Sequence, residues 1–248
     1  MAMADHILAH LSSPNHNGYQ LQHPNKTWYS QFRQDEKLWP LLRKFGPRSF
    51  FVESGAFDGE THSNTLSLER KGWHGLLVEP DPANHEALKA RQRRAHLFFG
   101  GLSTTQRDGN VDFAFDRNKK IKNYGENGGL AQYSNWRKTG GPGGVAQNIE
   151  SVYVAPLPAI LHAIGRRHVD YWSLDVEGAE EHILSAIFEE SSNLPMIEFG
   201  VLQIETVSEH TIKLLLSKGF VKKNIRTTLD QFWVNQSYLA ARGISVTD

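Results

Sequence analysis

The chain has 248 residues, with 27 basic and 27 acidic side chains and no cysteine. This length suits one large α/β domain with a proper core and would be cramped for two. The balanced charge gives no electrostatic reason to expect nucleic acid or an anionic membrane as a partner. The absence of cysteine excludes disulfides, thiolate ligands for zinc and a thiol nucleophile.

The amino-terminal segment, residues 1–28, mixes His, Asn, Pro and Ser without periodicity, so we expect an extension that wraps the surface or frays. Its apolar run is too short for a signal peptide, and no later run approaches the ~20 apolar residues of a membrane span. We therefore expect a soluble, cytoplasmic protein without a membrane segment. Residues 29–248 are predicted to form a single domain.

Helix and strand patterns alternate along this domain. A helix is predicted from Gln34 to Gly46, with Pro40 delaying or kinking it, and a second one follows the first strand and ends at Gly72. The predicted strands lie, in chain order, at 50–52, 76–78, 97–99, 169–174 and within 196–204, followed by short strands near 220–221 and 232–234. Apolar strands that alternate with amphipathic helices predict an α/β fold whose parallel sheet is covered on both faces. The last two strands suggest a C-terminal antiparallel hairpin.

The segment 116–150 breaks this pattern because it is rich in Gly, Asn and Lys. A structureless loop this long inside a compact domain is uncommon, and it is usually functional or disordered. Leu130, Tyr133 and Trp136 indicate that part of it packs over the domain, whereas a mobile insertion is the alternative. We expect a long loop insertion here.

Carboxylates follow almost every predicted strand: Glu53, Glu79, Asp175 with Glu177, and Glu205. Ligands of open α/β sheets bind beyond the carboxyl ends of the strands. Carboxylates gathered there repel one another unless a cation joins them, so the pattern predicts a cationic ligand. A loosely held Mg²⁺ on Asp175, Glu177 and Glu205 is an alternative, but no His-x-x-x-His or similar spacing indicates a metal site, and we predict none.

The turn after the first strand reads Glu53-x-Gly55-x-x-x-Gly59, with Asp58 inside it. A dinucleotide fold instead uses Gly-x-Gly-x-x-Gly to bring backbone N–H groups onto a pyrophosphate. Two unit charges ~4 Å apart near a protein surface interact by roughly 4 kcal/mol. Glu53 and Asp58 would therefore repel a pyrophosphate and attract a ligand with an ammonium and a sulfonium, such as S-adenosylmethionine (SAM). Alternatively, the two glycines only form a tight turn and Asp58 only caps a helix.

Glu79, at the end of the second strand, fits the same ligand. An acidic side chain there can accept both ribose hydroxyl protons, at about 1.5–3 kcal/mol per hydrogen bond. Because NAD enzymes use the same position, Glu79 indicates a nucleoside, and the acidic first turn indicates which kind. Asp81 fits a helix cap better than a ligand contact.

Asp175 and Glu177 are two residues apart at the end of a buried strand, so in extended geometry they project to the same side. We predict a functional role for both, whereas Glu180 favours the next helix N-terminus by its charge. His62, expected in the helix after the glycine turn, is a candidate base near the acceptor. An exposed or structurally satisfied histidine is the alternative.

Taken together, these motifs resemble the FkbM-type methyltransferases, a branch of the SAM-dependent Rossmann-like superfamily. The likeness spans roughly residues 29–234 and is carried by five segments: Tyr29-Ser30-Gln31 with Gln34-Asp35, Phe51–Gly59, Ser63–Leu66, Gly75–Pro82 and Ser173–Glu180. The Gly-Ala-Phe-Asp-Gly-Glu and Ser-Asn-Thr sequences are most similar to the subgroup that includes animal Star-like proteins. The chain departs from the family pattern at Glu53, where relatives often carry Asp, and at Phe57, where many carry Asn.

The resemblance implies a Rossmann-like SAM-methyltransferase fold with a seven-stranded, mostly parallel sheet, and SAM as the methyl donor. It also implies a hydroxyl acceptor on a small molecule or natural product, although some relatives methylate side-chain amides of peptides. The predicted cofactor contacts are Glu53, Gly55, Ala56, Asp58, Gly59, Asn64, Glu79, Asp81 and Asp175. The predicted catalytic residues are Asp175, Glu177 and His62.

Two rival functions stay open at this point. Star-like relatives are membrane-anchored and need not be enzymes, so a non-catalytic SAM-fold module that binds a partner protein is one. An NAD enzyme is the other, and the acidic first turn disfavours it. Nothing in the sequence predicts an oligomeric state.

Overall fold

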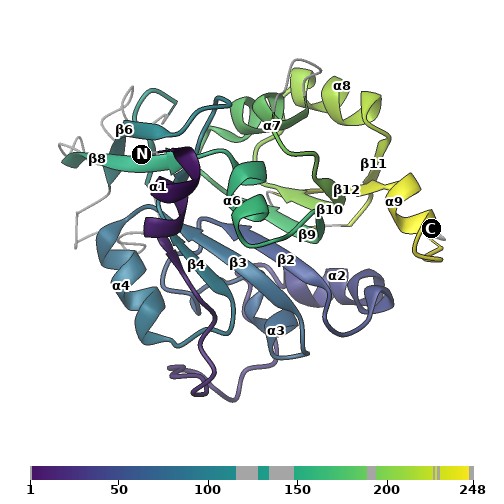
Figure 1. The fold of residues 1–248 in the computed structure, drawn as a ribbon. Coiled ribbons are helices and arrows are strands. Elements are labelled where there is room, and N and C mark those ends of the chain that lie inside the picture. Colours follow the sequence, from purple (N-terminus) through teal and green to yellow (C-terminus); the bar gives the residue numbers. More distant parts are fainter. Residues whose placement is uncertain are drawn as a thin grey trace.

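The computed structural model describes residues 2–115, 128–133, 148–188, 194–225, 227 and 230–245. Within these ranges the chain forms an eight-stranded sheet, a four-stranded sheet and flanking helices (Figure 1). The strands of the large sheet are β1 (Leu11–Ser12), β2 (Phe50–Ser54), β3 (His74–Glu79), β4 (His96–Phe99), β9 (His168–Leu174), β10 (Glu198–Ile204), β11 (Phe220–Lys223) and β12 (Gln231–Asn235). The helices are α1 (Met3–Ala9), α2 (Gln34–Leu42) with the 3-10 turn η1 (Arg43–Phe45), α3 (Leu66–Glu69), α4 (Pro82–Ala90), α6 (Leu157–Ala163), α7 (Glu180–Phe188), α8 (Glu209–Ser217) and α9 (Gln236–Ala240).

The large sheet is mixed and has the order β1-β4-β3-β2-β9-β10-β12-β11. Its five middle strands, β4, β3, β2, β9 and β10, are parallel to one another. In contrast, β1 is antiparallel to β4, β12 to β10, and β11 to β12. The expectation of a seven-stranded, mostly parallel sheet is therefore wrong, because the sheet has eight strands and is mixed, whereas the expected antiparallel pair near the C-terminus is present as β11 and β12. The amino-terminal segment adds β1 at one edge, where Leu11 pairs with Phe98, and β12 is inserted between β10 and β11.

The amino-terminal segment is also more ordered than its composition predicts. Helix α1 packs against α6, and its Ile7 is buried in the core. The expectation that residues 1–28 only wrap the surface or fray is thus wrong for α1 and β1. Among the described helices, none combines the length and the apolar character that a bilayer span requires.

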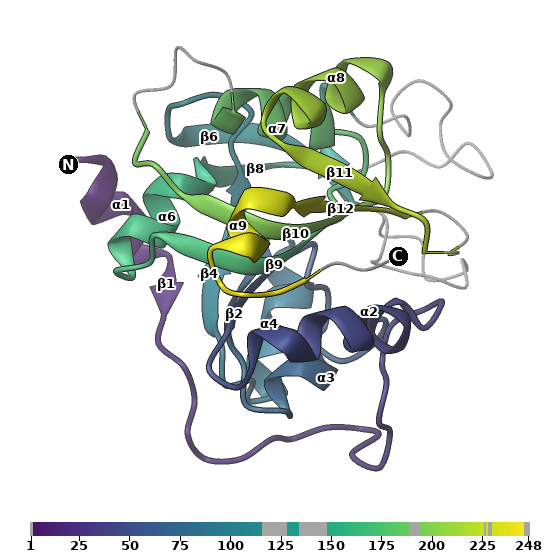
Figure 2. The same ribbon diagram turned by 90° about the vertical axis from the view of Figure 1, so that its right-hand side faces the viewer.

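Helices cover both faces of the large sheet, as predicted. Side chains alternate along each strand, so Phe50 and Val52 face one core and Phe51 faces the other. The first core includes residues of α1, α6, α7 and α8, and the second includes residues of α2, α3, α4 and α9. Figure 2 shows α7 and α8 on one side of the sheet and α2 and α3 on the other.

The second sheet has the order β5-β8-β6-β7 and is absent from the sequence prediction. Its strands are β5 (Gly101–Leu102), β6 (Gly109–Phe115), β7 (Gly129–Leu130) and β8 (Asn148–Ala155). The prediction of one loop over 116–150 is therefore wrong at β7 and at the start of β8. Residues 116–127 and 134–147, with Trp136, lie outside the described residues.

The chain reverses its direction of travel across the sheet between β2 and β9. From β2 it moves outward through β3 to β4, and it later returns through β9 on the other side of β2. Gly55 and Asp175 follow these two strands and touch. A Cβ on Gly55 would lie 2.1 Å from the Asp175 carbonyl oxygen, and Gly55 has φ +83°, so only glycine fits. Such a switch point is where open α/β sheets bind their ligands.

Candidate active site

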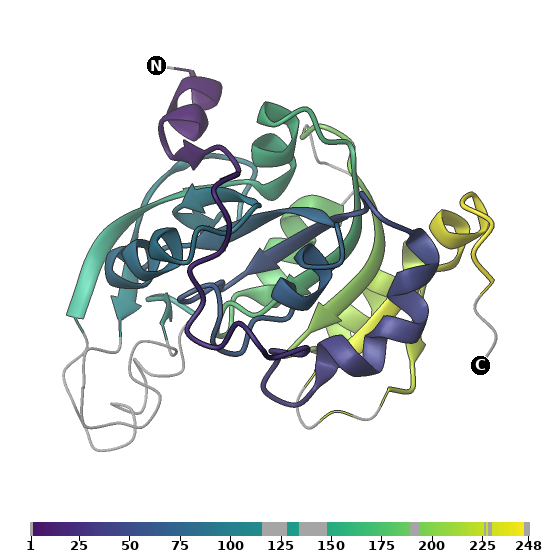
Figure 3. The ribbon, with the colours of Figure 1, turned by 90° about the horizontal axis from the view of Figure 1, so that it is seen from below.

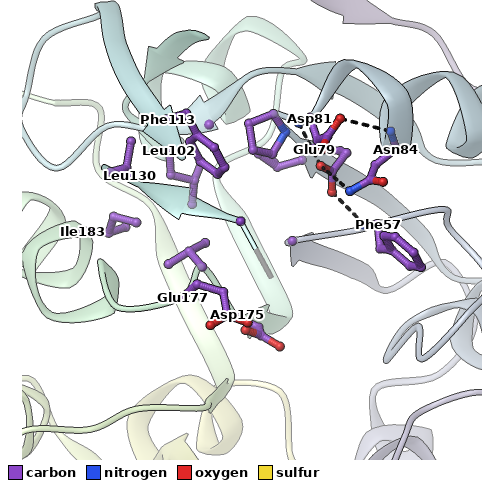
Figure 4. Close-up of a pocket in the computed structure, with 16 residues that line it drawn as sticks. Phe57, Glu79, Asp81, Asn84, Leu102, Phe113, Leu130, Asp175, Glu177 and Ile183 are labelled. Atoms are coloured by element: carbon purple, nitrogen blue, oxygen red, sulfur yellow. Dashed lines mark hydrogen bonds between the residues drawn. The ribbon is translucent and has the colours of Figure 1, made fainter. Parts of the chain in front are cut away.

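A pocket lies at this switch point, between the two sheets (Figure 4). The large sheet contributes Glu79 and Asp175 from its strand ends, and the second sheet contributes the apolar side chains of Leu102, Phe113 and Leu130. The cavity measures about 70 Å³. Because small-molecule sites typically offer roughly 300–1,000 Å³, a nucleoside can enter only if the lining moves apart.

The polar part of the lining is strongly acidic. Glu79, Asp81, Asp175 and Glu177 line the pocket, and the described lining contains no Lys, Arg or His. Figure 4 shows Glu79 and Asp81 at one end of the pocket and Asp175 with Glu177 at the other. Binding of a cation would favour the ionised form of these carboxyl groups, whereas a phosphate would meet no positive charge in the described lining.

Glu79 is held at the end of β3 by backbone donors. Its carboxylate accepts hydrogen bonds from the backbone N–H groups of Phe57 (2.7 Å) and Asp81 (2.9 Å). Burial nevertheless raises the pKa of Glu79 to about 8, against the smaller opposing effect of these amides. Asp81 in turn caps α4, because its side chain accepts from the backbone of Ala83 and Asn84. The predicted helix cap at Asp81 is thus confirmed, and the same residue also lines the pocket.

Asp175 belongs to a compact group of acids. One carboxylate oxygen from each of Asp175, Glu180 and Glu205 lies within 4.8 Å of the other two. Burial, followed by the charges of Glu205 and Glu177, raises the pKa of Asp175 well above its ordinary value. The sequence suggested Glu177 as the third possible magnesium ligand beside Asp175 and Glu205, but the third member of this group is Glu180.

Glu180 has a structural role that the sequence did not reveal. Its buried carboxylate accepts from the backbone N–H groups of Val176 and Gly178, and so it holds the turn between β9 and α7. Within that turn Glu177 takes a left-handed conformation, with φ +57°. The assumption that the strand stays extended through Glu177 is therefore wrong, because β9 ends at Leu174. Both predicted acids still reach the pocket.

Glu53 lies outside the pocket lining and organises a neighbouring turn. Its buried carboxylate accepts from Ser63 Oγ (2.9 Å), Thr65 Oγ1 (2.6 Å) and the backbone of Asn64. Burial raises the pKa of Glu53, while nearby Arg93 and these donors oppose the rise. A direct contact between Glu53 and a ligand stays a prediction.

Asp58 is likewise occupied by protein donors. It accepts from the backbone N–H groups of Glu60 and Thr61 and lies 3.2 Å from Arg91 Nη2. Although burial alone would raise the pKa of Asp58, these donors lower it. Arg91 also lies 3.1 Å from Glu60, and Asp58 does not line the pocket, so the acidic character of the pocket comes from the strand ends rather than from the glycine turn.

The other predicted residues of this segment do not line the pocket. Ala56 is buried in the second core, and a Cβ on Gly59 would collide with Leu88. His62 is exposed, has φ +58° and forms an isolated bridge with Ser30. Its predicted helix is wrong, since α3 begins only at Leu66 and side chains satisfy the preceding backbone instead.

Asn64 also lies outside the described pocket lining, but it contacts the end of β9. Its Nδ2 donates to Ser173 Oγ at 3.0 Å, near the end of β9 and two residues before Asp175. Its Oδ1 is buried and has no hydrogen-bond partner among the described residues. Asn64 therefore keeps a free acceptor close to the switch point.

Sequence reasoning missed the apolar wall of the pocket and one strained residue. Phe113 and Leu102 come from the second sheet, and the alternation of Val111, Phe113 and Phe115 was the signal that could have revealed it. Phe57 lines the pocket with φ +49°, a conformation that is rare for an aromatic residue. Nothing in the local sequence predicts that conformation.

Comparisons with known proteins identify the family. A solved structure described as a hypothetical protein of Thermus thermophilus is similar with a TM-score of 0.42 and 16% identity, over 90% of this chain and 96% of that one. Among curated proteins, none matches the chain. Membership of the Star-like subgroup stays a prediction. The family model described as "Methyltransferase FkbM domain" matches residues 53–222, more than half of the chain, and the chain therefore belongs to the FkbM methyltransferases.

Proposed function

We propose that the chain uses SAM to methylate a hydroxyl group of a small molecule or natural product, in the pocket at the switch point. The observation that carries this proposal is the lining itself, with four carboxylates and no basic residue among its described members. A sulfonium and an ammonium would stabilise the ionised form of these carboxyl groups, whereas the pyrophosphate of a dinucleotide would find no positive partner in the described lining.

The residues present fit SAM chemically. Glu79 can accept from the ribose hydroxyls, and the wall of Leu102, Phe113 and Leu130 suits an adenine ring. When bound, SAM supplies an activated methyl group on a positively charged sulfur.

The chain's own contribution is to orient the acceptor and to remove its proton. Correct positioning can supply about 7–11 kcal/mol of the barrier reduction. Asp175 and Glu177 lie together at one end of the pocket, and a base there is worth roughly 10²–10⁴-fold in rate. We assign the base to Glu177 and a supporting electrostatic role to Asp175. His62 is exposed and outside the lining, so we do not assign it a role.

Calorimetry tests the cofactor. We expect SAM and its demethylated product to bind and NAD not to bind. SAM should bind more tightly than its product, because only SAM carries the sulfonium charge. Binding of NAD without binding of SAM would overturn the proposal, and binding of neither would favour a non-catalytic module.

Replacement of the base tests the reaction. Glu177→Gln should retain SAM binding through the other three lining carboxylates and lower turnover by roughly 10²–10⁴-fold. Glu86→Gln, at a glutamate whose side chain is 71% exposed on α4, is the matched control and should change neither. If Glu177→Gln turns over normally, the base is a different group.

The acceptor class is tested by mass spectrometry of candidate acceptors incubated with methyl-labelled SAM. A label on oxygen is the expected result. A label on a side-chain amide nitrogen would instead support the peptide N-methylation that some relatives perform.

A further inference from the structure

A second cavity lies at the opposite edge of the large sheet, where the parallel strands begin. It is formed where η1, the start of β2, the start of β9 and the chain after α9 meet, and it measures about 360 Å³. Figures 1 and 3 both place α2 and α9 on the same side of the molecule. Its charged lining residues are Lys44, Arg48, Asp170 and Arg242, with His168 as a titratable neighbour. None of them belongs to the pocket at the switch point.

The fixed charges of this lining do not cancel. Lys44, Arg48 and Arg242 carry three positive charges against the single negative charge of Asp170. Asp170 is buried and already accepts from the Phe50 backbone (2.7 Å) and the Tyr238 hydroxyl (2.8 Å), and Arg242 Nε lies 3.7 Å away. The described lining therefore keeps an excess of two positive charges.

Two of the cations, although exposed, already contact neighbouring residues of the protein. The guanidinium carbon of Arg242 lies 3.4 Å from the centroid of the Tyr238 ring, and its Nη1 donates to the Tyr238 carbonyl. Lys44 Nζ donates to the Ser245 carbonyl at 2.8 Å. Ordered cations lose less conformational entropy on binding than free surface side chains do.

Arg48 has an unusual backbone. Its φ is +71°, a left-handed conformation that non-glycine residues rarely adopt and that concentrates at binding and catalytic sites. Glycine would fit this position with less strain, yet the chain places a guanidinium there, against the cavity.

We propose that this cavity binds a phosphate dianion, either as inorganic phosphate or as the end group of a small phosphomonoester. Guanidinium groups match the geometry of phosphate oxygens, and an excess of two positive charges matches a dianion. The volume lies within the range of small-molecule sites and exceeds the need of one phosphate group. The site is independent of the methyltransferase pocket.

Thermal denaturation and calorimetry test this site on the full chain. Phosphate should raise the melting temperature, while potassium chloride at the same ionic strength should not, since a bound ligand stabilises only the folded state. Glycerol phosphate is the second probe. A stronger effect of glycerol phosphate identifies a phosphomonoester as the source, and a stronger effect of phosphate identifies the free ion.

Arg48→Gly should lower the affinity for phosphate at least about tenfold and leave the affinity for SAM unchanged. Arg33→Gly is the matched control, because it removes another arginine at positive φ (+62°), one that pairs with Glu36 at the start of α2. It should retain the full response to phosphate. Lys44→Gln is a second test variant, which removes a positive charge without changing a residue at positive φ, and it should also weaken phosphate binding. The proposal is overturned if phosphate has no more effect than chloride, or if both variants respond like the wild type.

Discussion

Glu79 links the stability of the protein to pH, and Glu79→Gln tests this link. In the absence of ligand, burial raises the pKa of Glu79 from 4.5 to about 8. The folded state therefore binds a proton more readily than the unfolded state does. The resulting stabilisation is fully present below pH 4.5 and is lost as pH rises through 8.

The size of the effect follows from that rise. At about 1.4 kcal/mol per pH unit, a pKa raised from 4.5 to about 8 corresponds to a stability change on the order of 5 kcal/mol. Glu79 is only 4% exposed, so solvent screens this little. Glutamine cannot ionise, and its amide adds a pH-independent cost of about 1–3 kcal/mol because one of its two ends must face a backbone donor.

Urea denaturation of both proteins, from about pH 5 to about pH 9, measures the effect. The unfolding free energy of the wild type, relative to Glu79→Gln, should fall by several kcal/mol across this range. Glu86→Gln serves as the control for an exposed glutamate and should leave the pH profile unchanged. A difference between wild type and Glu79→Gln that stays constant with pH would refute the reasoning.

Three further outcomes follow from the geometry. Glu177→Gly should keep the free energy of unfolding within about 1 kcal/mol of wild type, because relief of left-handed strain offsets the lost side chain, yet it should lower turnover by roughly 10²–10⁴-fold. Gln92→Gly, at φ +52° away from the pocket, should keep both stability and turnover. Gly55→Ala should destabilise the fold by about 2–4 kcal/mol in urea denaturation. Gly18→Ala, with the same φ of +83° but open space around it, should cost only about 1 kcal/mol. Treatment with EDTA should leave methyl transfer unchanged, and a loss restored by Mg²⁺ would instead assign a metal to the acidic group around Asp175.

The sequence predicts the centre of the large sheet better than its surroundings. Strands β2, β3, β9 and β10 are buried on both faces, so their near-continuous apolar runs can be recognised without knowing their neighbours. Strands β1, β5 and β7 have two residues each, too few for any period to show. Their existence depends on partners that are distant in the chain, such as Phe98 for Leu11.

The site residues divide in the same way, into positions that the local sequence predicts and positions that depend on distant parts of the chain. Gly55, Glu79, Asp175 and Glu177 line the pocket as strand-end positions should, because the carboxyl ends of parallel strands converge wherever the sheet forms. Glu53 does not, although it lies two residues before Gly55. Alternation along β2 turns its side chain to the face covered by α3, where the hydroxyl groups that precede this helix satisfy it. The tertiary structure decides which face of the sheet carries such donors, and the spacing of residues in the sequence does not reveal it.

Net charge is the other quantity that the fold redistributes. The chain carries 27 basic and 27 acidic residues, and this balance gives no electrostatic reason to expect nucleic acid or an anionic membrane as a partner. In the folded structure, the two pocket linings at opposite ends of the parallel strands differ in their charge. The lining at their carboxyl ends is acidic, and the lining at their amino ends has an excess of two positive charges. A ligand experiences the charge within about 10 Å, the Debye length at ~0.1 M salt, rather than the sum over the molecule. A chain with no net charge can therefore carry an acidic lining at one end of its parallel strands and a basic lining at the other, which is the premise of both proposed sites.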